Sequence, residues 1–350
     1  MRVLHVVPDS VAIPKHLFLG STKDVRGRTE YLKTRGIPFD EIVIENRSDA
    51  LLLKKLRDLN LARYTTVLFE LPVYPASLRF LRRKFSQIKL LTRSINAEFY
   101  HRLHFTLARL QHVNRSKVLR DFKHSLSCLR LDFLCARYSD HVLSITQWEK
   151  DHYWRFMTGV SKVINVPYFL PGSYCHAAKP VAEKKMQCLC LMSTTQSTLP
   201  FLLDAAKRFT RLVEMLGRNF SEWDFYITGD FPANCLSLPK RVTPTGFLDT
   251  PFEIMAASRA VALLSDYGFG FKTKLLDAIQ CKCYALVTKG LYQRLPVEVQ
   301  PYCIVVDTGS VESFKNALEK CLEPYPEENP NEALRSQAFA ALDEIFYGQG

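Results

Sequence analysis

The sequence predicts an α/β protein of two domains, each built on a parallel sheet, that face each other across a cleft. Three observations lead to this prediction. Apolar runs of strand length alternate with amphipathic stretches of helix length almost throughout. The 350 residues are about twice the usual domain length. A phrase rich in proline and glycine interrupts the pattern near the middle of the chain.

Short apolar runs in the first half predict the strands of the first sheet. The expected strands are Val3–Val7, Glu41–Ile44, Thr65–Phe69, Ile88–Thr92, His141–Ile145 and Lys162–Val166. Basic amphipathic stretches at Leu51–Leu59 and Ser77–Ser86 predict short helices, and Arg102–Ser139 predicts one long helical region. The opening apolar run is too short for a signal peptide, and no run reaches the ~18 apolar residues that cross a bilayer. We therefore expect a soluble, cytoplasmic protein.

The domain boundary is expected in Asn165–Ser173, where two prolines and a glycine end a strand. A second α/β series follows it. The expected strands are Gln187–Met192, Asp224–Thr228, Ala260–Leu264, Tyr284–Thr288 and Cys303–Val306, and the expected helices are Leu199–Leu216, Pro251–Ser258, Lys274–Gln280, Val311–Cys321 and Asn331–Tyr347. A ligand of such a protein usually binds outside the carboxyl ends of the strands, between the domains.

The ten cysteines include two pairs with C-x-C spacing, Cys188/Cys190 and Cys281/Cys283. On a strand, this spacing places both sulfurs on one face. Zinc sites usually have wider cysteine spacing, and no histidine cluster accompanies these pairs. We expect the cysteines to be buried thiols and expect no metal site.

The net charge of +12 is unevenly distributed along the chain. Residues 51–150 hold 19 Lys and Arg against 7 Asp and Glu, a balance of +12, whereas residues 301–350 hold 3 against 9, a balance of −6. A basic region of this kind suits an anionic partner such as a membrane surface, a phosphorylated lipid or a nucleic acid. The alternative is a solvated helical surface rich in Lys and Arg.

The segment from Ala260 to Thr288 carries most of the recognisable chemistry. A buried strand runs into a glycine loop, a helix begins near Thr273, and a second strand follows. Glycines let the backbone approach a ligand closely, and lysines beside them suit a diphosphate. The residues expected to hold this diphosphate are Gly268, Gly270, Lys272, Thr273 and Lys274.

Asp277 follows Lys274 by three positions on the same expected helix, so it shares a face with Lys274 and can accept hydrogen bonds from ribose hydroxyls. The spacing excludes two other phosphate motifs, because the third glycine of G-x-G-x-x-G and the Gly-Lys-Ser/Thr of a P-loop are both missing. The segment therefore predicts a nucleotide site. The alternative is an ordinary helix start with solvated lysines.

The run Gly270–Ala278 resembles the nucleotide-sugar site of the retaining GT-B glycosyltransferases of family 4, in the form found in bacterial surface polysaccharide enzymes. The resemblance lies in a glycine, then Lys-Thr-Lys, then an acidic residue followed by alanine. It implies that Asp277 contacts the donor ribose, although the family typically has Glu there and a further Glu where this chain has Phe269. Gly246 and Phe247 are similar to family positions that flank the nucleotide base.

A weaker resemblance covers the first half of the chain. Leu91–Tyr100 is similar to a family phrase near the cleft, which implies that Arg93, Asn96 and Glu98 line the acceptor side. The resemblance as a whole implies a GT-B fold of two Rossmann-like domains, residues 1–172 on the acceptor side and residues 173–350 for the nucleotide sugar. The last helix of such a chain can cross back to the first domain.

The implied function is transfer of a glycosyl group from a nucleoside diphosphate sugar to a glycan or lipid-linked acceptor, with retention of configuration and without a metal or other cofactor. No catalytic residue can be named from the sequence. The implied location is the cytoplasm, with the basic region on an anionic membrane surface at its inner face. Three alternatives remain: a nucleotide-sugar epimerase of the same architecture, a non-catalytic GT-B module, and a basic nucleic-acid-binding protein, although no nucleic-acid motif is present.

Overall fold

Two parallel sheets form the framework of the computed structural model, which describes residues 1–13, 16, 19–112, 118–175, 178–192, 199–218, 220–229, 236–248 and 250–348. The first sheet contains β1 (Val3–Pro8), β2 (Phe39–Ile44), β3 (Thr66–Phe69), β4 (Lys89–Arg93), β5 (His141–Ser144) and β6 (Val163–Asn165). The second contains β7 (Lys185–Cys190), β8 (Asp224–Ile227), β9 (Val242–Pro244), β10 (Ser258–Leu263), β11 (Tyr284–Val287) and β12 (Cys303–Val305).

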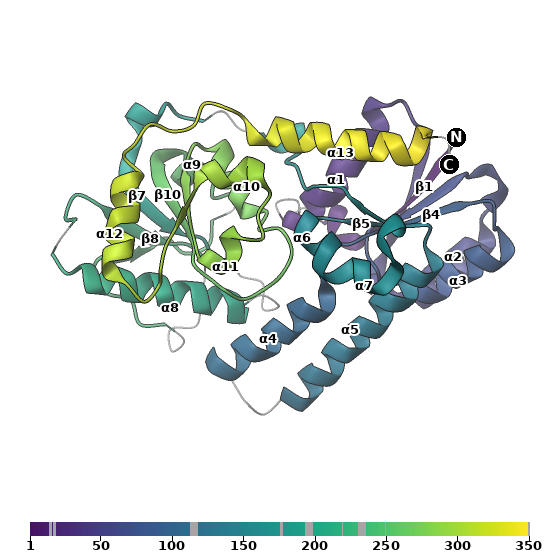
Figure 1. The fold of residues 1–350 in the computed structure, drawn as a ribbon, viewed down its shortest axis with the longest axis horizontal. Helices are drawn as coiled ribbons and strands as arrows, with labels where there is room; N and C mark the ends of the chain where they lie inside the picture. The colour runs from purple at the N-terminus through teal and green to yellow at the C-terminus, as the bar shows by residue number, and fades with distance from the viewer. Residues whose placement is uncertain are drawn as a thin grey trace.

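Neighbouring strands are parallel throughout, in the orders β2-β1-β3-β4-β5-β6 and β12-β11-β10-β7-β8-β9. The predicted α/β class with two parallel-sheet domains is confirmed (Figure 1). The first sheet is drawn from residues 3–165 and the second from residues 185–305. We keep 1–172 and 173–350 as the proposed domain limits.

Helices connect the strands and cover both faces of each sheet (Figure 1). Those before β7 are α1 (Gly20–Thr34), α2 (Asp49–Asp58), α3 (Pro75–Lys84), α4 (Glu98–His112), α5 (Val118–Tyr138), α6 (Gln147–Glu149) and α7 (Arg155–Thr158). Those after β7 are α8 (Leu199–Leu216), α9 (Phe252–Ala257), α10 (Lys274–Gln280), α11 (Lys289–Tyr292), α12 (Val311–Lys320) and α13 (Pro330–Tyr347).

Alternation along the strands decides which helices each side chain meets. On β3, Leu68 packs with α1 and α13, whereas Val67 and Phe69 pack with α2 and α3. Because both faces are covered, such strands are continuous apolar runs in the sequence. In the second sheet, Cys188 and Cys190 lie together on the face covered by α8 and α12, as their spacing predicts.

The last helix, α13, returns to the N-terminal domain and lies beside α1 (Figure 1). The Phe339 ring meets the Tyr31 ring edge-on, with 5.2 Å between the centroids. The Asp343 carboxylate accepts hydrogen bonds from the Tyr31 hydroxyl at 3.0 Å and from the Arg35 guanidinium at 2.9 Å. One helix of the second half of the chain thus completes the core of the first domain.

The structure corrects the sequence-based expectations at several elements, among them the short helices α6, α7 and α11, which were not expected. Helix α1 was not predicted at all. The expected long helical region Arg102–Ser139 is two helices, α4 and α5, which pack against each other, with residues 113–117 outside the described part (Figure 1). The short edge strand β9 was also missed. Among the described residues, every helix is too short or too polar to span a lipid bilayer.

Candidate functional site

The loop between β10 and α10 packs against the N-terminal domain. Gly268 and Gly270 have φ angles of +87° and +91°, a backbone conformation that residues with side chains rarely adopt. A Cβ atom on Gly270 would lie 2.7 Å from the Ile95 carbonyl oxygen and 2.1 Å from the end of the Asn96 side-chain amide. Glycine is therefore required where this loop meets the turn after β4.

Replacing Gly270 by alanine is expected to destabilise the protein more than replacing Gly217. Both glycines have positive φ, +91° and +59°, so an alanine at either position costs about 1–2 kcal/mol of backbone strain. At Gly217 no atom of the described residues beyond its chain neighbours and its own helix backbone lies within 4 Å of an added Cβ, whereas at Gly270 the added atom meets Ile95 and Asn96 and costs about 1–3 kcal/mol more. Urea unfolding of both variants measures the difference, and equal losses would contradict the close contact.

Two half-buried lysines follow the loop. The Lys272 ammonium donates to the Tyr267 carbonyl at 3.2 Å, and the Lys274 ammonium donates to the Leu191 carbonyl at 3.1 Å. Within the described residues, no carboxylate lies at ion-pair distance from either ammonium group. Two positive charges paired only with neutral oxygens favour the approach of an anion.

Burial dominates the electrostatics of both lysines. It lowers the pKa of Lys272 to about 8, with smaller contributions from the positive charges of Arg294 and Lys274. It likewise lowers the pKa of Lys274 to about 8, although Cys190 and Asp277 act in the opposite direction. In the absence of an anion, both ammonium groups therefore lose their protons around pH 8.

Asp277 and Thr273, predicted to share the nucleotide site, both lie against α1 of the other domain. Asp277 is buried, with 6% of the whole residue exposed. Its carboxylate accepts a hydrogen bond of 2.7 Å from the Lys23 ammonium. The Thr273 side chain faces Gly20, where an added Cβ would lie 2.0 Å from the Thr273 hydroxyl oxygen. Local sequence patterns could not indicate these partners, since Lys23 and Asp277 are 254 residues apart.

The two residues predicted to flank the nucleotide base lie after β9. Gly246 has a φ of +70°, and its carbonyl accepts a hydrogen bond of 2.7 Å from the Gly229 amide, which joins the ends of two neighbouring strands. The Phe247 side chain is 57% exposed. An exposed aromatic ring beside a loop that follows a strand is available to stack on a base, and this role stays a prediction.

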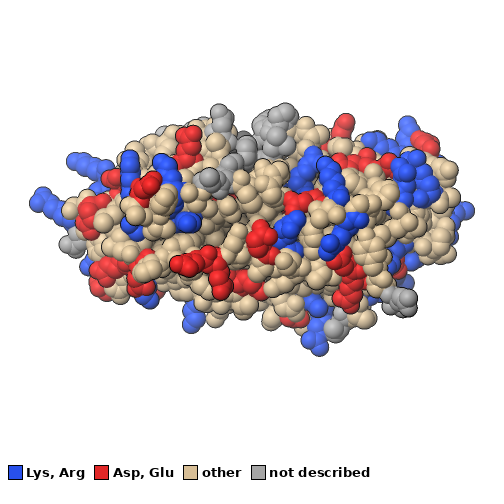
Figure 2. All heavy atoms as spheres, turned by 90° about the horizontal axis from the view of Figure 1, so that it is seen from above, with Lys and Arg blue, Asp and Glu red and all other residues tan. Residues whose placement is uncertain are grey.

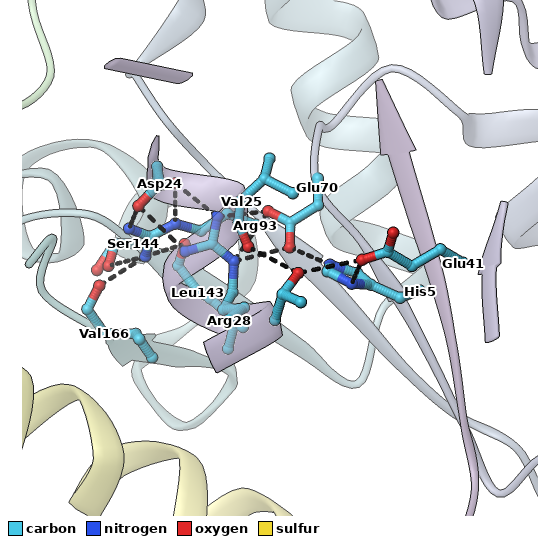
Figure 3. A network of polar contacts seen from close by, with 11 residues as sticks. His5, Asp24, Val25, Arg28, Glu41, Glu70, Arg93, Leu143, Ser144 and Val166 are labelled. Atoms are coloured by element: carbon cyan, nitrogen blue, oxygen red, sulfur yellow. Dashed lines mark hydrogen bonds and ion pairs between the residues drawn. The ribbon is translucent and has the colours of Figure 1, made fainter. Parts of the chain in front are cut away.

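Of the three residues predicted on the acceptor side, Arg93 is fully buried inside the N-terminal domain (Figure 3). Its guanidinium donates twice to the Asp24 carboxylate, at 2.7 and 3.0 Å. It also donates to the carbonyls of Ser144 at 3.1 Å and Val166 at 2.6 Å. These bonds engage the guanidinium within the domain, so in this structure Arg93 positions other elements.

Asn96 and Glu98 lie closer to the domain interface. In the amide orientation that satisfies both groups, Asn96 donates to the carbonyls of Ile95 at 3.0 Å and Phe269 at 2.8 Å. Glu98 pairs with Arg102 one helical turn away, at 3.0 Å. Burial acts to raise the pKa of Glu98, but the nearby His101 and Arg102 outweigh it and lower the pKa. Their contact with an acceptor stays a prediction.

A buried ionic network holds α1 against the carboxyl ends of the first sheet (Figure 3). Arg28 on α1 pairs with Asp24 at 2.7 Å and with Glu70, the residue after β3. Glu70 also contacts the His5 ring at 2.5 Å. Burial acts to raise the pKa of Asp24, but Arg28 and Arg93 outweigh it and hold that pKa well below its usual range. The network fixes the start of α1, including Lys23, at the domain interface.

Phe269, a departure from the resembled family, lies at the centre of an aromatic cluster between the domains. Its ring centroid is 5.3 Å from that of Tyr100, 4.5 Å from that of His104 and 5.2 Å from that of Trp148. The central carbon of the Arg294 guanidinium lies over the Phe269 ring, 4.6 Å from its centroid. Each cation or aromatic contact of this kind adds about 0.5–1.5 kcal/mol to the burial of the ring.

Comparison with known proteins adds to this geometry. Residues 185–324 match the family model described as Glycosyl transferases group 1. No curated protein sequence matches the chain.

Several solved structures share the fold along nearly the whole chain. HepE from Anabaena, in complex with UDP and glucose, is 14% identical, with 99% of this chain and 95% of HepE covered and a TM-score of 0.55. Sucrose-phosphate synthase from Thermosynechococcus elongatus is 12% identical, with 99% and 95% covered and a TM-score of 0.62. The lipopolysaccharide outer core galactosyltransferase WaaB is 12% identical, with 99% of both chains covered and a TM-score of 0.60.

These similarities confirm the predicted GT-B fold. At such low sequence identity, the solved structures by themselves show the fold and do not show the activity or the substrate. Together with the group 1 match in the C-terminal domain, they support a GT-B glycosyltransferase.

Proposed function

We propose that this chain transfers a hexosyl or other glycosyl group from a nucleoside diphosphate sugar to a glycan or lipid-linked acceptor in cell-surface polysaccharide synthesis. The observation that carries the proposal is the pair Lys272 and Lys274, which are half-buried at the domain interface and paired only with carbonyls among the described residues. HepE, with the same fold, has been solved with UDP and with UDP-glucose, so UDP is the first nucleotide to test.

Charge placement suits the chemistry of this transfer. As the glycosidic bond to the donor phosphate breaks, negative charge develops on the leaving diphosphate, and fixed ammonium groups stabilise it. Lys272 and Lys274 would supply this stabilisation, and on this basis we propose that the reaction needs no metal ion. The resemblance of Gly270–Ala278 to the retaining enzymes supports the proposal that the reaction retains configuration, and NMR of the anomeric proton in the first-formed product tests it.

Calorimetry with a panel of nucleoside diphosphates tests the proposal directly. We expect one of them, with UDP first, to bind at a single site, and the corresponding nucleotide sugar to release its diphosphate when an acceptor glycan is added. Addition of EDTA is expected to leave that release unchanged. A chain that binds no nucleoside diphosphate, but binds RNA in a salt-sensitive manner, would overturn the proposal.

A non-catalytic GT-B module is the second candidate function. The observation that favours it is Phe269, which stands where the resembled family has a carboxylate and packs among aromatic rings. Such a module would bind the nucleotide sugar without turnover. Diphosphate binding combined with no release from a panel of nucleotide sugars, across several acceptor glycans, would favour this candidate.

We further propose that the basic region docks on an anionic membrane at the cytoplasmic face. A groove of about 560 Å³ lies between α2, α3 and α5, and none of its lining residues is acidic. The lining residues are Leu53, Arg57, Pro75, Ala76, Arg79, Phe80, Arg83, Lys84, Leu134 and Tyr138. Elsewhere the charges are mixed: on the face that carries α13, acidic and basic side chains are interspersed (Figure 2).

Helix α5, which lines the groove with Leu134 and Tyr138, also carries an exposed apolar stripe. Leu119, Phe122, Leu126 and Phe133 are between 44% and 80% exposed, and their spacing of three, four and seven residues places them on one side of the helix. Exposed basic residues lie beside them, including Arg130 and Arg137. An apolar stripe bordered by cations is typical of helices that lie in the interface of an anionic bilayer.

Charge reversal in the groove tests this docking surface. The triple variant Arg79→Glu, Arg83→Glu and Lys84→Glu is expected to lose about 3 kcal/mol, roughly a hundredfold, in binding to vesicles that contain phosphatidylglycerol. Flotation measures the bound fraction, with phosphatidylcholine vesicles as the uncharged comparison. Reversal of Arg211, Arg218 and Lys240, exposed on the C-terminal domain, is the matched control. Equal losses in the two variants, or no dependence on the anionic lipid, would contradict the proposal.

A further inference from the structure

Lys23 reaches from the N-terminal domain into the candidate nucleotide site of the other domain. Its ammonium donates to the Asp277 carboxylate at 2.7 Å, and the two side chains are 2% and 9% exposed. The ammonium also lies 5.6 Å from the ring centroid of Tyr174 and 5.3 Å from that of Phe252. Lys23 is thus a buried cation enclosed by one carboxylate and two aromatic rings.

The position of Lys23 is fixed by its helix. Asp24 and Arg28, on the same helix, bind Arg93 and Glu70 at the carboxyl end of the first sheet. At the start of the helix, Gly20 contacts Thr273 so closely that an added Cβ would overlap the hydroxyl oxygen. Since α1 is held at both points, Lys23 is presented to the residues around α10.

Among the described residues of the candidate nucleotide site, positive charge is in excess. Lys23, Lys272 and Lys274 contribute three ammonium groups, and among the described residues only Asp277 forms an ion pair with any of them. Lys23 and Lys274 are close enough to influence each other, because Lys23 acts to lower the pKa of Lys274. A buried excess of charge is costly, and an anion with two or three negative charges would neutralise it.

We infer that Lys23 is a ligand of the donor diphosphate and that Asp277 holds it only while the site is empty. Donor binding exchanges this ion pair: Asp277 accepts hydrogen bonds from the ribose hydroxyls, and Lys23 joins Lys272 and Lys274 on the diphosphate. The inference rests on the proposed function. It explains how a buried carboxylate and a buried ammonium each keep a partner in both states, which avoids the cost of an isolated buried charge.

If the ion pair is exchanged on donor binding, loss of Lys23 should affect the binding of the nucleoside and of the diphosphate differently. A purely structural ion pair between the domains would affect uridine, inorganic pyrophosphate and UDP alike, through the stability of the interface. A phosphate ligand affects only molecules that carry phosphate. In addition, the Lys23 ammonium competes with ribose for Asp277, so its removal is expected to help a ligand that has ribose and no phosphate.

Calorimetry on two variants tests the inference. In Lys23→Met, affinity for pyrophosphate and UDP is expected to fall about tenfold to a hundredfold, as for loss of a hydrogen bond between charged groups, while affinity for uridine stays the same or rises. In Asp277→Asn, the opposite pattern is expected, with weaker uridine binding and unchanged or tighter pyrophosphate binding. Opposite patterns cannot result from partial unfolding, and thermal unfolding of both variants checks the fold.

The outcomes separate this inference from the proposed function. If UDP binds the wild type and Lys23→Met equally well, the inference is overturned and the function stands. If no nucleoside diphosphate binds the wild type but pyrophosphate binding still falls in Lys23→Met, the proposed function is overturned and the anion contact of Lys23 stands. An equal fall for uridine and UDP would assign Lys23 a structural role and would also overturn the inference. Asp343→Asn, which loosens α13 at a distance from the lysines, is the control for the domain interface.

Discussion

Replacing Lys274 by methionine is expected to weaken UDP binding by about a hundredfold, and replacing Lys272 and Lys274 together is expected to abolish it. Each lysine supplies a charge-assisted hydrogen bond to the diphosphate, which contributes about 1.5–3 kcal/mol in a partly buried site. Methionine keeps the unbranched side chain and removes the charge. Calorimetry measures the affinity, with the exposed Lys289→Met as the matched control.

The fold of these variants is expected to survive. Burial lowers the pKa of each lysine to about 8, which means that the charged form is disfavoured in the empty protein. Removing such a charge relieves that cost, so the melting temperature of Lys274→Met should equal or exceed that of the wild type at pH 7. A variant that binds UDP normally, or one that loses binding only because it unfolds, would contradict the assignment.

The same affinity is expected to fall as the pH rises above about 8. A bound diphosphate favours the charged lysines and raises their pKa values, whereas the empty protein loses those protons near pH 8. Above that pH, binding must take up protons, so affinity decreases by up to about tenfold per pH unit for each lysine. The phosphates of UDP are already ionised there, since their last pKa is near 6. A flat profile between pH 7 and 9 would contradict the role of both lysines.

Replacing Arg93 by methionine is expected to destabilise the N-terminal domain by about 3–5 kcal/mol. The variant would leave the buried Asp24 with one cation in place of two, and the carbonyls of Ser144 and Val166 would lose their donor. Because the network fixes α1, the start of that helix should lose its order first. Arg93→Lys should be almost as harmful, since an ammonium cannot reproduce the planar fork that serves all four bonds.

Urea unfolding followed by tryptophan fluorescence measures this effect. Trp148 and Trp154 report on the N-terminal domain, and Trp223 reports on the C-terminal domain, so single-tryptophan versions separate the two transitions. The matched control is Arg82→Met, which removes a half-exposed ion pair with Asp140 and should cost at most about 1 kcal/mol. Comparable losses for Arg93 and Arg82 would show that the buried network adds little.

The ion pairs of Asp24 in the buried network should persist to a lower pH than ion pairs of ordinary carboxylates. Arg28 and Arg93 hold the pKa of Asp24 well below its usual range in spite of burial. A carboxyl group whose pKa is lowered in the folded state contributes stability at pH values above its unfolded pKa, and that contribution disappears only as the pH falls through the folded value. We therefore expect the contribution of Asp24 to persist below pH 4.

The strands could be predicted from the sequence because both faces of each sheet are covered, so most strands are continuous apolar runs. Helix α1 could not, because the residues it buries are largely polar. Lys23, Asp24 and Arg28 are buried in ionic contacts and leave no apolar stripe. The first residue also lacks a side-chain cap, since Leu19 precedes the helix. The only local sign was the spacing of Asp24 and Arg28, one turn apart.

Some residues of the candidate site could likewise be predicted from the sequence, and others could not. Gly270, Lys272 and Lys274 lie on one short segment, so their spacing alone indicated an anion site. Lys23 comes from a distant part of the chain, and such a contact leaves no trace in local spacing. Phe269 was visible only as a departure from a family pattern, and its role depends on rings from α4 and α6. Arg93 was expected near an acceptor, and its burial depends on α1, which was not predicted.

Helix α13 has a consequence for how the chain is made and recombined. During synthesis, α1 emerges from the ribosome early, yet the helix that covers Tyr31 is translated only after the rest of the C-terminal domain. Until then, the apolar surface around Tyr31 and Phe169 remains open to water and to chaperones. A chimera that joins the first half of one related chain to the second half of another would therefore pack α13 of one protein against α1 of the other. Exchanging α13 together with α1 avoids this mismatch in the core of the first domain.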